Sequence, residues 1–126
     1  MPSVFDYIND LSKDKKNLFE QDPEMNEKTY NQFMVNKGFS YYPDTILHAA
    51  EMNLLKMSNS MHNKYFLEAI KPRKRFSKWF KPEKDADLDI VQRYYKCGKR
   101  EAQDYVKILS IEEINSIKRE LNPGGA

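Results

Sequence analysis

Glycine is nearly absent from the interior of this chain of 126 residues. Gly38 and Gly98 are its two interior glycines, and the other two, Gly124 and Gly125, lie near the end. No Asn-Gly or Asp-Gly pair marks a hairpin, and the β-favouring residues Val, Ile and Thr together number 14. Apolar residues instead recur three and four positions apart, as in Leu47, Ala50, Leu54 and Met57 and again in Ala102, Tyr105, Val106 and Leu109. We therefore expect an all-α fold.

Helix boundaries can be predicted from the residues that start and stop helices. Gly38 and Gly98 are expected to take the left-handed conformation after helices that end near Lys37 and Cys97. Ser110 and Glu113 have the spacing of a capping box. About six short helices are predicted, over residues 3–14, 27–37, 44–57, 60–70, 85–97 and 99–121, the last broken near Ser110. They suggest one compact domain over 1–121, with a loose connection at 12–27 and a flexible tail at 122–126.

Charge is distributed unevenly along the chain, although the total is only +2. Residues 71–84, the basic segment, hold seven Lys and Arg side chains against Glu83 alone, a net charge of +6. The rest of the chain is therefore at −4, and the near-neutral sum combines a basic segment with an acidic body. Lys and Arg neutralise phosphates, and aromatic rings between them can stack on bases or anchor a protein interface.

Two roles are open for the basic segment. In the first, it binds DNA or a protein partner, and the candidate contact residues are Arg73, Lys74, Arg75, Lys78, Trp79 and Lys81. In the second, Phe76 and Trp79 insert into the core and the cations form a solvated rim. Composition alone does not decide between them.

The sequence lacks the residue patterns of several catalytic and metal sites. A nucleotide-binding G-x-x-x-x-G-K-[ST] loop is missing, and Cys97 with His48 and His62 is too small a set for a thiolate zinc site. A single cysteine fits a reducing compartment, and no apolar run approaches the roughly 20 residues of a membrane helix. We expect a cytosolic, non-catalytic protein without a cofactor, a metal or a membrane partner.

The order of residues resembles that of a known family, the small, non-ATPase subunit of the sliding-clamp loader of T-even-type bacteriophages, in its short marine-phage version. The most specific stretch runs from Pro72 to Trp79, where a helix stop, spaced cations and a tryptophan follow one another. The similarity extends through the segments 5–10, 30–36, 42–44, 51–54, 65–67, 93–94 and 102–109.

This resemblance implies a collar-type or bridging helical domain in a larger machine. Its partners would be AAA+ ATPase subunits, the sliding clamp and primer-template DNA, in the cytoplasm of the infected host. The basic segment would contact DNA, the clamp or an ATPase neighbour. The aromatic residues proposed for the subunit interface are Phe39, Tyr41, Tyr42, Tyr94 and Tyr95. The alternative is an autonomous helical protein that binds nucleic acid through residues 71–84.

Overall fold

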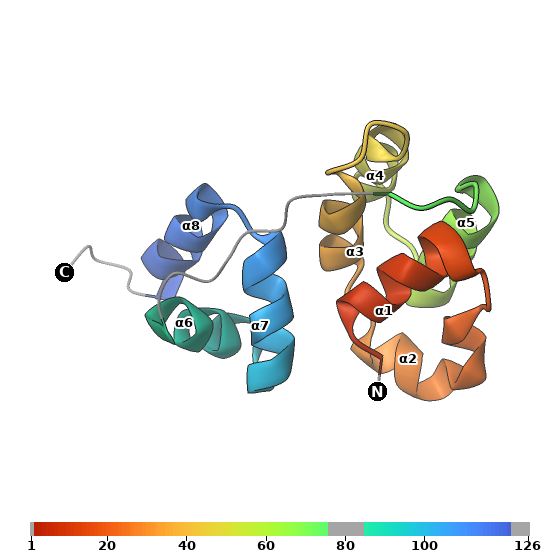
Figure 1. Ribbon diagram of the computed structural model, residues 1–126. Helices are drawn as coiled ribbons and strands as arrows, with labels where there is room; N and C mark the ends of the chain where they lie inside the picture. The colour runs from red at the N-terminus through yellow and green to blue at the C-terminus, as the bar shows by residue number, and fades with distance from the viewer. Residues whose placement is uncertain (1, 76–84, 122–126) are drawn as a thin grey trace. The chain divides into compact units, whose positions relative to one another are not determined.

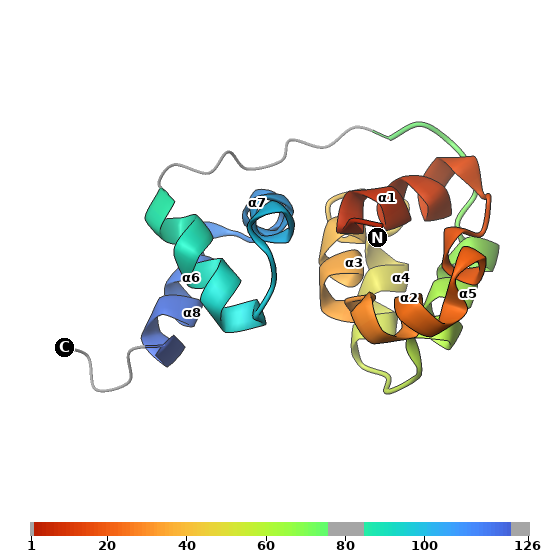
Figure 2. The ribbon, with the colours of Figure 1, turned by 90° about the horizontal axis from the view of Figure 1, so that it is seen from below.

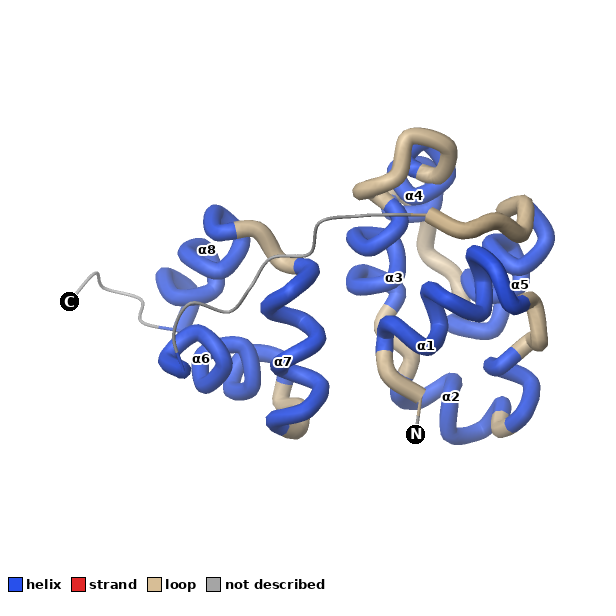
Figure 3. The backbone as a smooth tube through the Cα atoms, viewed as in Figure 1, coloured by secondary structure: helices blue, strands red, loops and turns tan. Residues whose placement is uncertain are grey.

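The computed structural model describes residues 2–75 and 85–121, and in these residues all regular structure is helical (Figure 3). The all-α prediction is confirmed, although eight α-helices and two shorter helical turns replace the six predicted helices. Contacts within the chain group into two compact units, Met1–Ser77 and Lys78–Ala126, where a single domain was expected. The division falls inside the basic segment, and each unit is described by itself.

Unit 1 contains five α-helices and two helical turns (Figure 1). Its elements are α1 (Val4–Asn9), the π-helical turn η1 (Asp10–Asp14), the 3-10 turn η2 (Leu18–Gln21), α2 (Pro23–Thr29), α3 (Gln32–Phe39), α4 (Ile46–Asn53) and α5 (Asn59–Ala69). Helix α3 packs against both α1 and α4, and α5 packs against η1 and α2. Phe39 and Phe66 are fully buried and stack with ring centroids 4.9 Å apart, which joins α3 to α5.

Unit 2 is a three-helix cluster of α6 (Asp85–Tyr95), α7 (Lys99–Ile108) and α8 (Ile111–Leu121). Helix α6 packs against both of the others, as Figure 2 shows from a second direction. Its core is made of small and aliphatic residues with one tyrosine: Val91, Ala102, Tyr105, Val106, Ile108, Leu109, Ile114 and Ile117. The capping box predicted between α7 and α8 is confirmed, because the Ser110 N–H donates to Glu113 Oε1 at 2.9 Å and the Glu113 N–H to Ser110 Oγ at 3.2 Å.

The glycines do not end helices in the predicted way. Gly38 lies inside α3 and is buried, and a Cβ at this position would overlap Cδ1 of Ile8. Gly98 precedes α7 with an extended backbone of φ −72° and ψ 166°. The left-handed conformation expected there belongs to Lys96, with φ 53°. Gly38 is therefore explained by the close approach of α1 to α3 rather than by a helix end.

The loose connection predicted for 12–27 is wrong. Asp10 is buried, and its carboxylate accepts the N–H groups of Lys16 and Leu18 at 2.8 and 2.9 Å, which folds the chain back after α1. Phe19 then enters the core, and the buried Asn26 donates to its carbonyl at 2.8 Å. One large apolar residue and two buried polar side chains therefore order a stretch that is polar overall.

Candidate functional site

The start of the basic segment is tied to the surface of unit 1 by Arg75. Its guanidinium donates to both carboxylate oxygens of Asp44, with Nη2 to Oδ2 at 2.7 Å and Nε to Oδ1 at 3.1 Å. It also donates to the carbonyls of Ser12, Lys71 and Arg73 at 2.7, 2.9 and 3.1 Å. Its side chain is only 4% exposed. Arg75 was predicted to contact DNA or a partner, and in unit 1 its guanidinium is bonded to Asp44 and to three backbone carbonyls.

The neighbouring cations are placed differently. Arg73 and Lys74 are exposed, as is Lys71, and the Arg73 N–H donates to the Ser12 carbonyl at 3.0 Å. The backbone is thus held while the side chains reach the solvent. The other predicted contact residues, Lys78, Trp79 and Lys81, lie outside the described residues.

A pocket of about 330 Å³ opens beside these cations, between the first turn of α4 and the chain that follows α5. It is lined by Asp44, Thr45, His48, Ala69, Ile70, Lys71, Arg73 and Arg75. The hydrogen bonds from Arg75 hold the pKa of the Asp44 carboxyl below its usual value, and the nearby charge of Arg73 acts in the same direction. The carboxylate therefore stays ionised and paired with Arg75.

The aromatic residues predicted for the subunit interface are divided between the two units and differ in exposure. Phe39 and Tyr42 are buried in unit 1, contrary to the expectation that their rings are available to a partner, and Tyr41 is half-buried. In unit 2, the half-buried Tyr95 packs between Tyr94 and Tyr105, and Tyr94 is 37% exposed. Their number alone suggested excess aromatic surface, but two of the five residues are buried and two are half-buried.

The larger apolar surface of unit 1 lies on α3 and α4, and it was not predicted. Leu47 in α4 is 79% exposed, and Leu54, the C-cap of α4, is 85% exposed. Ile46, at the start of α4, is 43% exposed. These leucines belong to the apolar repeat from which the helix was predicted, whereas α4 buries Ala49 and Met52. The sequence of this helix carries two apolar stripes, and a single core can cover only one of them.

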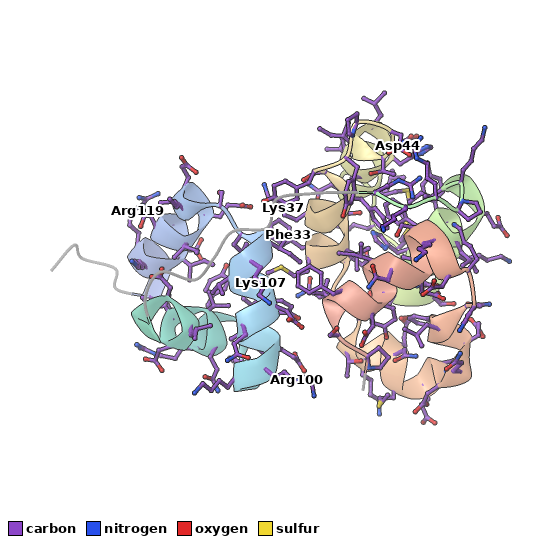
Figure 4. The ribbon with its side chains drawn as sticks, viewed as in Figure 1. Phe33, Lys37, Asp44, Arg100, Lys107 and Arg119 are labelled. Atoms are coloured by element: carbon purple, nitrogen blue, oxygen red, sulfur yellow. The ribbon has the colours of Figure 1, made fainter. Side chains whose placement is uncertain are left out.

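An open groove of about 150 Å³ runs beside this surface, lined by Phe33, Asn36, Lys37, Ser40, Ile46, Ala49, Ala50 and Asn53. Figure 4 labels Phe33 and Lys37 on α3 and Asp44 ahead of α4, and in unit 2 it labels Arg100 and Lys107 on α7 and Arg119 on α8. Lys37 supplies the one charge in the groove lining, and its ammonium lies 5.6 Å from the centre of the Tyr41 ring. The groove is thus mainly apolar with a cation at its rim.

His62 and Cys97 have structural surroundings. His62 is fully buried, and burial lowers its pKa to about 4. Its ring lies between the Tyr30 hydroxyl at 2.7 Å and Asn36 Oδ1 at 2.8 Å. Burial, followed by the nearby charge of Glu101, raises the pKa of the Cys97 thiol, which opposes formation of a reactive thiolate.

Across residues 2–75 and 85–121, His, Cys, Asp and Glu side chains form no group of three or more that could hold a metal ion. In the same residues, no helix combines the length and apolar character needed to cross a bilayer.

Comparison with known proteins places the chain in a class of phage replication machinery. Residues 1–121 match the family model described as bacteriophage clamp loader A subunit, so the chain belongs to this family. The family predicted from the order of motifs is thereby confirmed. A particular relative is the sliding-clamp-loader small subunit of Enterobacteria phage T4, which is 28% identical over 90 residues. The aligned region is 67% of this chain and 48% of the relative, so the chain spans about half the length of the curated relative it matches.

Proposed function

We propose that this protein is a non-ATPase accessory subunit of a phage clamp loader. It assembles with AAA+ ATPase subunits, which open the sliding clamp and load it onto primer-template DNA. The observation that carries this proposal is the family match over residues 1–121. The sequence supports it further, because the chain lacks a nucleotide-binding loop of its own and concentrates cations in residues 71–84.

The apolar surface of α3 and α4 is the part of unit 1 suited to an ATPase subunit. Exposed leucines beside an open groove lose solvent contact when a partner covers them, and burial of each large side chain stabilises a complex by about 1.5–3 kcal/mol at most. The occupant we propose is therefore an amphipathic segment of the ATPase subunit, whose apolar side chains cover these leucines.

Co-expression with the ATPase subunit of the same phage tests this function. The two proteins should co-elute, and the complex should hydrolyse ATP faster when clamp and primer-template DNA are added. The double variant Leu47→Ser/Leu54→Ser should reduce co-elution, whereas Met61→Ser changes an equally apolar side chain, 64% exposed on α5, and should not.

The alternative, an autonomous nucleic-acid-binding protein, makes the opposite prediction. The isolated chain would then bind DNA tightly, with a steep dependence on salt concentration, and would not co-elute with the ATPase subunit. That pair of results would refute the proposed function.

A further inference from the structure

The pocket beside the start of the basic segment has the size and lining of a small ligand site. Its volume of about 330 Å³ lies at the lower end of the range of roughly 300–1,000 Å³ typical of ligand pockets. Among the described residues that line it, three are Lys or Arg, one is His, and one, Asp44, is acidic. A group that fills this space meets mainly donors of hydrogen bonds.

Pairing inside the lining leaves an excess of positive charge. The bidentate contact between Arg75 and Asp44, at 2.7–3.1 Å, neutralises the one carboxylate among the described lining residues. Lys71 and Arg73 then contribute a net charge of +2 to the lining, and both side chains are exposed to solvent. Such cations are the usual contacts of phosphate groups, and Arg can bind two phosphate oxygens at once.

The helix ends at the pocket also favour an anion. The carboxyl end of α5 would repel it, but Lys15 Nζ donates to the carbonyls of Leu67 and Phe66 at 2.8 and 3.3 Å and offsets that negative end. On the opposite side the first turn of α4 lines the pocket and adds partial positive charge.

His48 offers a further donor. Its Nδ1 lies 2.8 Å from the Tyr65 hydroxyl. When that hydroxyl donates to Nδ1, the neutral ring carries its hydrogen on Nε2, which is able to donate to an anion. The hydrogen bond from the Arg73 N–H to the Ser12 carbonyl holds the backbone of the facing residue in place. Both walls of the pocket are therefore fixed before a ligand arrives.

We propose that this pocket binds a phosphate group of the DNA backbone. Lys71 and Arg73 contact its oxygens, His48 donates a hydrogen bond, and Arg75 acts as a positioning residue that holds the segment against Asp44. The choice of DNA as the source of the phosphate rests on the proposed function, because a clamp loader acts on DNA. A free phosphate or a nucleotide would present the same chemistry to the same residues.

The test uses the isolated full chain, so that it does not depend on assembly with an ATPase. A short mixed-sequence DNA duplex is titrated into the isotope-labelled protein, and the amide signals of Lys71 and residues 73–75 and the ring signals of His48 should shift. Binding measured by fluorescence anisotropy between about 50 and 200 mM salt gives the slope of log K against log [salt]. Lys71→Gln and Arg73→Gln should each lower the magnitude of that slope by about 1. Lys28→Gln removes the same charge from the exposed part of α2 and is the matched control.

Three outcomes overturn all or part of the proposal. If neither the duplex nor inorganic phosphate shifts these signals, or if Lys28→Gln changes the slope as much as Lys71→Gln does, the pocket is not a phosphate site. If inorganic phosphate or ATP shifts them and the duplex does not, the ligand is a free phosphate or nucleotide and the DNA assignment is wrong. If only an oligo-aspartate peptide shifts these signals, the surface binds an acidic protein. Co-elution with the ATPase subunit is measured separately, so failure here leaves the proposed function testable.

Discussion

Acidification should destabilise unit 1 through a single buried histidine. His62 is fully buried, and its ring is held between the Tyr30 hydroxyl and the side-chain oxygen of Asn36. The neutral ring satisfies both contacts when Nδ1 accepts from Tyr30 and Nε2 donates to Asn36. A proton on Nδ1 removes that acceptor and places a charge in the core, which is why burial lowers the pKa to about 4 from 6.5.

The sign and size of the effect follow from this difference. Because the folded state binds the proton more weakly than the unfolded chain, stability is complete above pH 6.5 and falls as the pH drops towards 4. Each tenfold difference in proton affinity is worth about 1.4 kcal/mol, so the full loss is about 3 kcal/mol and the loss at pH 5 is about 2 kcal/mol.

The measurement compares the wild-type protein with His62→Gln, whose amide can accept and donate but does not titrate. Urea unfolding is followed at pH 8 and pH 5 by the amide signals of buried residues in α3 and α5, which report on unit 1 alone. Between these pH values the wild type should lose about 2 kcal/mol more than the variant. Equal losses would refute the reasoning, and so would a His62 ring signal in the wild type that titrates near pH 6.5.

Three further substitutions probe the packing and the helix ends. Gly38→Ala should destabilise unit 1 by about 1–2 kcal/mol in urea unfolding, because overlap with Ile8 outweighs the better helix propensity of alanine. Gly98→Ala, where the space around the new methyl group is open, should be close to neutral, and equal effects at both sites would contradict the packing argument. Ser110→Ala should lower the stability of unit 2 by about 1 kcal/mol, as measured by the loss of its amide signals on heating, and an unchanged transition would show that the capping box contributes little.

Features decided by neighbouring residues could be predicted from the sequence. The helical class follows from apolar spacing, and the break at Ser110 follows from a cap whose two partners are three residues apart. The end of α5 at Ala69 likewise lies just before Pro72. In each of these cases the interacting groups lie within one or two helical turns along the chain.

Features that depend on residues far apart in the sequence could not be predicted. Asp44 and Arg75 are 31 positions apart, and nothing in either local sequence pairs them. Helix α4 has an apolar stripe on each of two faces. Which stripe is buried depends on how α3 packs against α4, and in this fold Ala49 and Met52 are buried while Leu47 stays exposed. For the same reason, the charge count singles out the basic segment but does not give the role of each cation.

The Arg75 pair changes how substitutions in the basic segment must be interpreted. Residues 71–75 contain four cations, yet one of them is neutralised by Asp44 and anchors the backbone of the others. Replacement of Arg73, Lys74 and Arg75 together would therefore remove charge and anchoring at once, and a loss of DNA response would not distinguish the two. Lysine at position 75 is not a conservative change either, because an ammonium cannot reproduce the bidentate contact and the three carbonyl bonds in one plane. Single substitutions of the exposed cations isolate the electrostatic contribution, whereas Asp44→Asn isolates the anchor.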